Sequence, residues 1–161
     1  MTVSDFLTAD RVVFLSAEDR DGAVNELVEA VCDRIPGLDR DAIRRRVFER
    51  EDALSSRMGE GVAMPHAVID TMASTVAAVG VSRPGIAWDT SREEPVRLVV
   101  LLVGNRDQHL DVLQEIASRL RDPVLYERLV DAAEPAEVYD LLTQPVTRES
   151  EGVVYQGQEL S

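Results

Sequence analysis

The sequence predicts a single domain of the α/β class, and three observations lead to this prediction. Apolar runs rich in β-branched residues, at residues 11–15, 75–81 and 97–103, have the length and composition of strands. Other segments repeat apolar residues every three or four positions, as amphipathic helices do. The chain of 161 residues is long enough to bury about two-thirds of its unfolded surface, so a hydrophobic core can hold it together without disulfides.

Two helices are expected after the strand at residues 11–15. The first covers residues 22–35, with Asp21 placed to cap its start and Pro36-Gly37 placed to end it. Its apolar face comprises Val24, Leu27, Val28, Val31 and Ile35. The second covers residues 39–51, and its inward residues are Ala42, Ile43, Val47 and Phe48. The last turn of this second helix delivers Arg50 to the loop that follows.

The strands at residues 75–81 and 97–103 form the middle of the chain. The later one is almost wholly apolar, as expected of a strand buried on both faces. Their connection is too short for a crossover helix, so we expect the two strands to pair antiparallel. Trp88 lies in this connection and is interpreted as a packing residue at the end of the sheet, while a role in stacking on a ligand is unsupported.

The last third is predicted to be helical. A helix at residues 108–121, capped by Asn105 or Asp107, has an apolar face made of Leu110, Leu113, Ile116, Ala117 and Leu120. His109 lies in its first turn, with the ring expected to point toward the sheet or its rim.

Two more helices begin at Pro123 and Pro135, because proline suits the first helical position. Their core positions are Val124, Leu125, Leu129, Val130, Val138, Leu141 and Leu142. We place the domain at residues 1–145. Residues 146–161 are interpreted as a loosely ordered tail with a short strand at residues 153–155.

The composition excludes several classes of function. The chain has 17 basic residues, all of them arginine, and 30 acidic residues, which give a formal charge of −13. Such a surface repels phosphate backbones, so no nucleic-acid partner is expected. No signal peptide and no run of membrane-spanning length occur, which predicts a cytoplasmic protein without direct membrane insertion. Cys32 is the single cysteine, and its place in a helical pattern favours packing over a reactive thiol.

The most distinctive stretch runs from residue 57 to His66 and follows Arg50, Ser55 and Ser56. Pro65 fixes its own backbone and pushes Met64 into an extended conformation, so His66 is presented from the stiff end of a strand. A chemically active imidazole would be held in this way. The motif by itself fits a structural histidine in a glycine-rich turn equally well.

The two histidines together suggest a site for an anion. His109 lies at the start of a helix, where unpaired N–H groups and the macrodipole favour negative charge. If it meets His66, with Arg50 alongside and the hydroxyls of Ser55 and Ser56 in reach, the pocket can hold a phosphoryl group. No metal is expected, because two histidines without a third ligand make a weak zinc site. The most economical use of these residues is a histidine that carries phosphate itself.

The segment REDALSSRMGEGVAMPH, at residues 50–66, resembles the active-site signature of a known family. This family comprises the enzyme IIA components of the fructose, mannitol and nitrogen-regulatory (type 2) branch of the bacterial phosphotransferase system. The blocks PGIAWD, EPVRLVVLLVG and DQHLDVLQEIASRLRDP are similar to the family as well, and the last of them holds the second histidine. The resemblance extends from about residue 5 to residue 143.

This resemblance implies a mixed parallel and antiparallel sheet flanked by helices. It also implies that His66 accepts a phosphoryl group from an HPr-type phosphocarrier and passes it to a IIB partner. His109 would donate a hydrogen bond to the phosphoryl oxygens and Arg50 would neutralise their charge. Alignment and electrostatic stabilisation suffice for such a transfer, so no cofactor is expected.

The chain also departs from the family pattern. Arg57 stands where many members have an uncharged residue; we interpret it as a solvated side chain, with a phosphate ligand or a docking contact as alternatives. Basic residues that commonly follow the active-site histidine are absent here. Val62, Met64 and Val68 could keep water from the site, or could equally be packing residues.

Two functions of different classes fit these residues. The first is a phosphocarrier of a sugar phosphotransferase system, which relays phosphate to a IIB protein. The second is a nitrogen-related regulatory protein whose phosphorylation state controls its binding to a kinase, a transporter or another target. A family-like domain that is never phosphorylated is a third alternative, and the presence of His66, His109 and Arg50 argues against it.

Overall fold

A mixed sheet of five strands forms the centre of the computed structural model, which describes residues 2–59, 61–89, 94–149 and 152–155. The order is β1 (Val12–Phe14), β4 (Val76–Ile86) and β5 (Val96–Gly104), with β2 (Val62–Ala63) and β3 (His66–Val68) both paired to the far side of β5. Strands β4 and β5 pair antiparallel, whereas β1, β2 and β3 pair parallel with their neighbours. The prediction of a mixed sheet is therefore confirmed, as is the antiparallel central pair.

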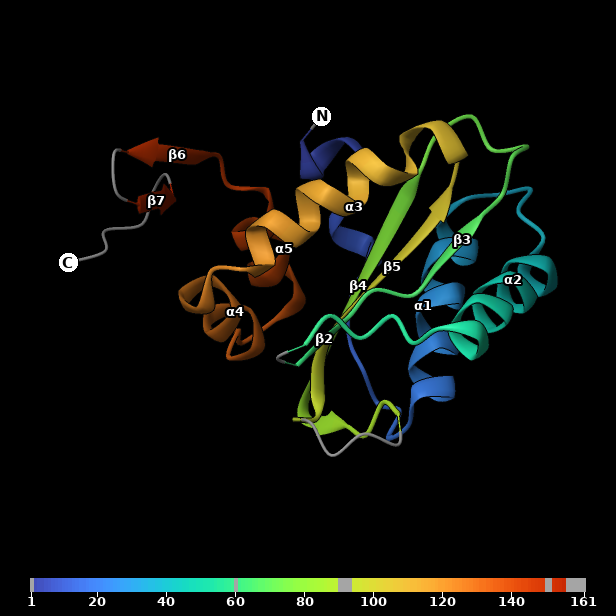
Figure 1. The fold of residues 1–161 in the computed structure, drawn as a ribbon, viewed down its shortest axis with the longest axis horizontal. Helices are drawn as coiled ribbons and strands as arrows, with labels where there is room; N and C mark the ends of the chain where they lie inside the picture. Colours follow the sequence, from blue (N-terminus) through green and yellow to red (C-terminus); the bar gives the residue numbers. More distant parts are fainter. Residues whose placement is uncertain (1, 60, 90–93, 150–151, 156–161) are drawn as a thin grey trace.

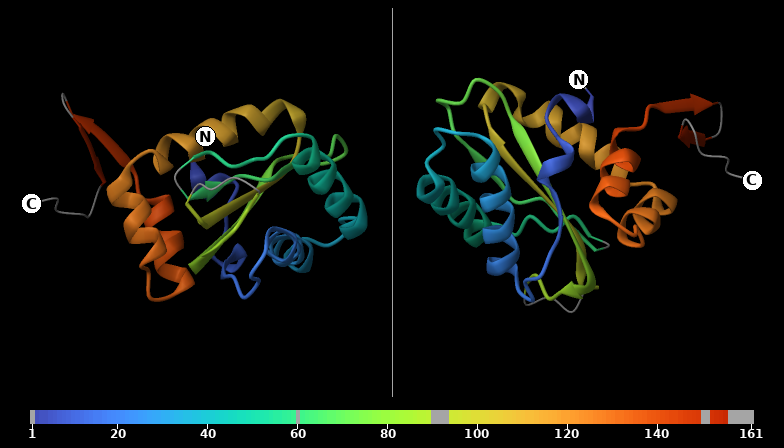
Figure 2. Two further views of the ribbon diagram at one scale, coloured as in Figure 1. Left: turned by 60° about the horizontal axis from the view of Figure 1, so that its bottom comes forward. Right: turned by 180° about the vertical axis from the view of Figure 1, so that it is seen from behind.

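Helices cover both faces of this sheet (Figures 1 and 2). On one face lie α1 (Arg20–Arg34) and α2 (Arg40–Ala53); on the other lie α3 (Arg106–Leu120), α4 (Pro123–Val130) and α5 (Pro135–Thr143). Two 3-10 turns, Val3–Asp5 and Ala9–Arg11, precede β1. No helix among the described residues combines the length and the apolar character needed to span a membrane.

Strand β5 shows why the sequence builds two cores. Leu98, Val100 and Leu102 belong to the core beneath α3, α4 and α5. Val99, Leu101 and Val103 belong to the core beneath α1 and α2. Successive side chains of a strand point to opposite faces, so an unbroken apolar run supplies both layers.

The predicted helices occur with small corrections at their starts. Asp19 caps α1 by accepting a hydrogen bond from the Gly22 N–H group, whereas Asp21, the predicted cap, lies in the first turn. Asp21 cannot be the cap, because a cap must precede the first helical residue and α1 already begins at Arg20. Asp39 caps α2, which continues two residues beyond the predicted end to Ala53. Asn105, one of the two residues considered, caps α3.

Two residues assigned to the core are exposed. The side chains of Leu110 and Val124 are 60% and 46% exposed. Both lie near the starts of their helices, α3 and α4. By contrast, the packing role of Trp88 is confirmed, since it is 2% exposed within the core beneath α1 and α2. Cys32 is half-buried against the same core, and this burial raises the pKa of its thiol.

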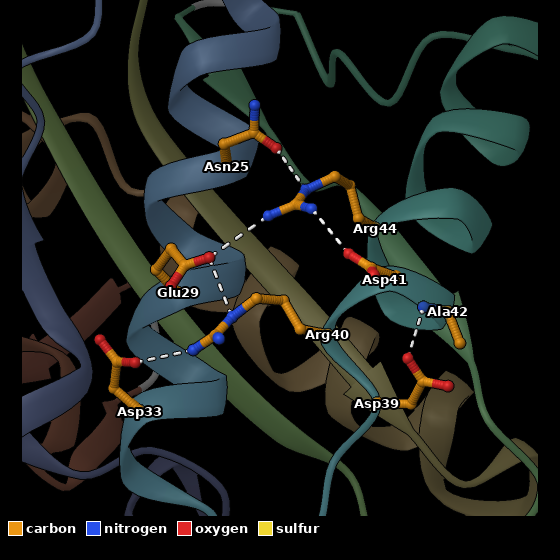
Figure 3. A network of polar contacts seen from close by, with 8 residues as sticks. All are labelled: Asn25, Glu29, Asp33, Asp39, Arg40, Asp41, Ala42 and Arg44. Atoms are coloured by element: carbon orange, nitrogen blue, oxygen red, sulfur yellow. Dashed lines mark hydrogen bonds and ion pairs between the residues drawn. The ribbon is translucent and has the colours of Figure 1, made fainter.

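A polar network joins α2 to α1 (Figure 3). Arg40 and Arg44 project from the start of α2 and both contact Glu29 of α1, at 2.9 and 3.3 Å. The same arginines also reach Asp33 at 2.8 Å and Asn25 at 2.9 Å. Ion pairs with this much exposure are each worth under about 1 kcal/mol, so their main effect is to fix how α2 lies on α1. The second half of α2 carries the arginines of the site described below.

The chain ends in a hairpin that stands apart from the main sheet (Figure 1). Strands β6 (Val146–Glu149) and β7 (Gly152–Tyr155) pair antiparallel with each other. The predicted strand at residues 153–155 corresponds to β7, whereas β6 was not predicted. The division of the chain at residue 145 and the loose order of the tail remain predictions.

Candidate functional site

A break in the sheet edge positions His66. Strands β2 and β3 both pair with β5, and Met64 and Pro65 lie between them. The Met64 N–H group donates to the carbonyl of Ser56 at 3.1 Å, and the Leu102 N–H group donates to the carbonyl of Pro65 at 3.0 Å. His66 therefore starts β3 from a backbone that is held on both sides.

The backbone also selects the tautomer of His66. Its Nδ1 atom lies 3.0 Å from the carbonyl oxygen of Met64. A carbonyl can only accept a hydrogen bond, so in the neutral ring the proton sits on Nδ1 and the lone pair sits on Nε2. Nε2 is therefore the ring nitrogen whose lone pair is available to react.

A second histidine faces this ring from the other layer. His109 lies in the first turn of α3, and the ring centroids of His66 and His109 are 4.7 Å apart with a tilt of 55°. Two polar contacts hold the start of α3: Asn105 donates to the carbonyl of Met72 at 3.1 Å, and the Gln108 side chain accepts from the Thr75 N–H group at 2.9 Å. These contacts anchor the helix start that carries His109.

The pKa of His109 is lowered from 6.5 to about 4. Burial is the main cause, and electrostatic interactions with His66 and Arg50 add to it. The ring is therefore neutral at neutral pH. Both of its nitrogens are buried and have no hydrogen-bond partner within the part of the chain that the structure describes. A neutral imidazole in this state has one N–H group to offer to an anion.

The two histidines line a pocket of about 380 Å³ that is formed by residues of α2, β3 and the start of α3. Its lining comprises Arg46, Glu49, Arg50, His66, Ala67, Val68 and His109. The structure thus brings His66, His109 and Arg50 to one place. The Nη1 group of Arg50 donates to the carbonyl of Leu54 at 2.9 Å, which holds its guanidinium at the end of α2.

Arg46 is a pocket residue that the sequence analysis missed. It lies one helical turn before Arg50, so both side chains leave α2 on the same side. Its Nη1 group contacts the carbonyl oxygen of Val68 at 3.4 Å. The spacing of four residues from Arg50 was the signal in the sequence that could have identified it.

Ser55, Ser56 and Arg57 do not line this pocket. The hydroxyl of Ser55 donates to Asp89 at 3.2 Å, and Ser56 is buried. Interpreting Arg57 as a solvated side chain is wrong, because the side chain is 5% exposed and contacts Asp89 at 3.3 Å and the carbonyl of Glu94 at 2.6 Å. These contacts tie the loop after α2 to the loop after β4.

Of the three apolar candidates, Val62 and Met64 are core residues, in line with the packing alternative. Val68 lines the pocket beside His66. Alternate residues of a strand share a face, so Val68 and His66 are expected to point the same way.

The comparison with protein families shows which family this fold belongs to. The family model described as phosphoenolpyruvate-dependent sugar phosphotransferase system, EIIA 2, matches residues 5–144. This chain belongs to that family. The resemblance seen in the sequence is thereby confirmed, and the five-stranded sheet with its two helical layers is the EIIA domain of this chain.

Two relatives of this EIIA domain are named for different functions. A fructose-specific EIIA component from Haloferax volcanii is 27% identical over 153 residues, covering 91% of this chain and 99% of that protein. A nitrogen regulatory protein from Klebsiella oxytoca is 30% identical over 125 residues, covering 74% of this chain and 76% of that protein. The family therefore includes members named for sugar transport and members named for nitrogen regulation.

Solved structures share the fold of this EIIA domain. The nitrogen regulatory protein IIA-Ntr from Neisseria meningitidis superposes with a TM-score of 0.79 at 22% identity, covering 88% of this chain and 99% of that one. The mannitol enzyme IIA from Escherichia coli, solved in complex with phosphorylated enzyme IIB, gives a TM-score of 0.72 at 19% identity. That match covers 85% of this chain and 98% of the other.

A buried carboxylate holds the loop of the EIIA domain that leads to His66. Glu51 is 3% exposed. It accepts a hydrogen bond from the Ser56 N–H group at 3.2 Å and another from the indole N–H of Trp88 at 3.3 Å. The carbonyl of Ser56 in turn accepts a hydrogen bond from the Met64 N–H group. This network therefore connects α2 to the backbone segment that precedes His66. No pattern in the sequence indicates this network, since Glu51 and Trp88 are far apart in the chain.

Proposed function

We propose that this chain is a phosphocarrier, an EIIA component that accepts a phosphoryl group on Nε2 of His66 from the phosphohistidine of an HPr-type carrier and passes it to a IIB partner. One observation carries the proposal. The contact between Nδ1 of His66 and the carbonyl of Met64 leaves the lone pair on Nε2, in a pocket that also holds Arg50 and His109.

The transfer exchanges one P–N bond for another. The Nε2 lone pair of His66 attacks phosphorus, and the P–N bond to the donor imidazole breaks. The donor ring, protonated on its other nitrogen, leaves as neutral imidazole. His66 keeps its Nδ1 proton, so the positive charge passes to the ring of His66. The carbonyl of Met64 accepts that Nδ1–H group and stabilises the charged ring.

The remaining groups act on the phosphoryl oxygens. In phosphoryl transfer, proteins contribute chiefly alignment and stabilisation of the equatorial oxygens. Arg50 supplies a fixed positive charge at the end of α2, and His109 supplies an N–H donor. No cofactor enters this mechanism. The transfer from the HPr-type carrier to His66 and the transfer from His66 to the IIB partner each move the phosphoryl group from one protein side chain to another.

A regulatory function is the second candidate. It is favoured by the 30% identity to a nitrogen regulatory protein, against 27% for the fructose-specific component, although the latter match covers more of both chains. In this function His66 is phosphorylated in the same way, and the phosphorylation state controls binding to a target protein. The chemistry of the pocket supports both candidates, and what happens after phosphorylation distinguishes them.

The test is phosphorylation with purified components. The protein is incubated with phosphoenolpyruvate, enzyme I and HPr, and acid-labile phosphate is measured. We expect wild type to be labelled and His66→Ala to remain unlabelled. Absence of label in wild type, with a donor that labels another EIIA protein, would contradict the proposal. A IIB protein is then added: loss of label to IIB supports the relay, and retained label with phosphorylation-dependent binding to a target supports regulation.

A further inference from the structure

Arg46 lines the histidine pocket, and the proposed transfer assigns it no role. It is an exposed residue on the second half of α2, one turn before Arg50. Its contact with the carbonyl oxygen of Val68 is long, at 3.4 Å. A hydrogen bond of this length is weak, so little free energy is lost when the guanidinium turns to a better acceptor.

The two arginines share a pocket with His66 but are anchored to different carbonyl groups. Arg50 is held by the carbonyl of Leu54, in the loop that leads from α2 toward the β2 strand. Arg46 is held by the carbonyl of Val68, the last residue of the strand that begins with His66. Both guanidinium groups therefore belong to the lining of the pocket that holds the His66 imidazole.

The charge of the pocket depends on Arg46. The other fixed charges in the lining are Arg50 and Glu49, which balance each other. The chain as a whole carries a formal charge of −13, so its distant residues do not attract an anion. Arg46 therefore gives the pocket its net positive charge, and this charge favours the binding of a phosphoryl dianion.

On these grounds, and resting on the proposed phosphorylation of His66, we propose that Arg46 binds the phosphoryl group of phospho-His66 directly. Its guanidinium leaves the carbonyl of Val68 and donates charge-assisted hydrogen bonds to a phosphoryl oxygen. Arg46 and Arg50 then both bind the dianion. A guanidinium suits this role because its planar array of N–H donors matches phosphate oxygens.

The neighbouring residue provides a matched control. Arg45 is also exposed on α2. Both Arg45 and Arg46 line a groove of about 540 Å³ between α2 and the segment after β3, but only Arg46 also lines the histidine pocket. Arg46→Gln and Arg45→Gln remove the same charge from adjacent positions of one helix. A difference between the two variants therefore reports on contact with the phosphoryl group and not on total charge.

Two measurements test the contact. In phosphorylation by phospho-HPr, we expect Arg46→Gln to slow transfer by roughly tenfold to hundredfold, the effect of losing one charge-assisted hydrogen bond, and Arg45→Gln to change it by less than about threefold. In the isolated phosphoprotein, ³¹P NMR titration should give a higher phosphoryl pKa for Arg46→Gln than for wild type, because a nearby cation favours the dianion. Arg46→Lys, which restores the charge but not the planar donor array, should fall between wild type and Arg46→Gln.

The outcomes separate this inference from the function on which it rests. If wild type is not labelled on His66, the proposed function fails and the inference fails with it. If wild type is labelled and Arg46→Gln matches it in rate and phosphoryl pKa, Arg46 has no such role while the function stands. A slower transfer with an unchanged phosphoryl pKa would identify Arg46 as a docking residue and overturn direct binding. Equal effects of the two variants would point to long-range charge and overturn it as well.

Discussion

The imidazole rings of His66 and His109 lie 4.7 Å apart, although one begins an edge strand and the other lies in the first turn of a helix on one face of the sheet. At this distance a proton on one ring disfavours a proton on the other, and Arg50 acts on His109 in the same direction. The empty pocket therefore holds His109 in its neutral form.

Phosphorylation should reverse this effect. We expect His109 to titrate near pH 4 in the unmodified protein and at a clearly higher pH once His66 carries a phosphoryl group, because the dianion stabilises the imidazolium. NMR titration of the ring protons in both forms measures the change. An unchanged or lower value in the phosphoprotein would mean that His109 does not contact the phosphoryl group.

The lowered pKa also predicts how stability depends on pH. Between about pH 4 and pH 6.5 the unfolded chain binds a proton on His109 that the folded chain does not, so the free energy of unfolding should rise with pH across this range. Above this range the contribution is constant. Because the ring is partly exposed, we expect a difference of about 1–2 kcal/mol, less than the full shift would give. Urea unfolding of wild type and His109→Gln at several pH values measures it, and parallel curves for the two proteins would contradict the prediction.

Glu51→Gln should destabilise the domain and loosen the loop before His66. The amide that replaces one oxygen cannot accept the hydrogen bonds from Ser56 and Trp88 in the same way, and a buried donor left without a partner costs about 1–3 kcal/mol. Chemical denaturation gives the loss of stability, and tryptophan fluorescence follows the surroundings of Trp88. Glu49→Gln, an exposed position on the same helix, is the control and should change the free energy of unfolding by less than about 0.5 kcal/mol.

Gly104→Ala should be more damaging than Gly59→Ala, although both glycines have positive φ. Gly104, with φ of 149°, ends β5 just before α3, and a Cβ there would lie 2.5 Å from the backbone of Ser74 and Thr75. Gly59, with φ of 85°, has open space at the same place. We expect a loss of roughly 2–4 kcal/mol for Gly104→Ala and about 1 kcal/mol for Gly59→Ala, measured by urea unfolding. Equal losses would show that backbone strain alone matters.

Much of the fold could be predicted because it follows from local patterns. The apolar run of β5 and the spacing of apolar residues in α1, α2 and α3 reflect which faces are buried, and these periods are visible without a structure. Cap positions were missed by two residues at α1 because several acidic residues stand close together there. Leu110 was misplaced because periodicity locates the apolar face of a helix but not how far the sheet extends beneath it.

The pocket was partly predictable for a similar reason. His66 and Arg50 belong to one continuous motif, and His109 lies at a helix start, so their types and local settings pointed to an anion. Arg57 could not be read correctly, since its burial depends on Asp89 and Glu94, which reach it through the fold. Arg46 was overlooked in a run of three arginines that look alike in the sequence, although Arg46 is the one of the three that lines the histidine pocket.

The gap between β2 and β3 has a consequence for engineering this domain. In an uninterrupted edge strand, the carbonyl groups of successive residues would point alternately toward the neighbouring strand and toward the solvent. Here the two-residue interruption frees the carbonyl of Met64 to bind Nδ1 of His66, while Pro65 keeps the hydrogen bond to β5. Lengthening or shortening residues 64–65 should therefore remove the contact that keeps the proton on Nδ1 of His66, without altering any side chain of the pocket.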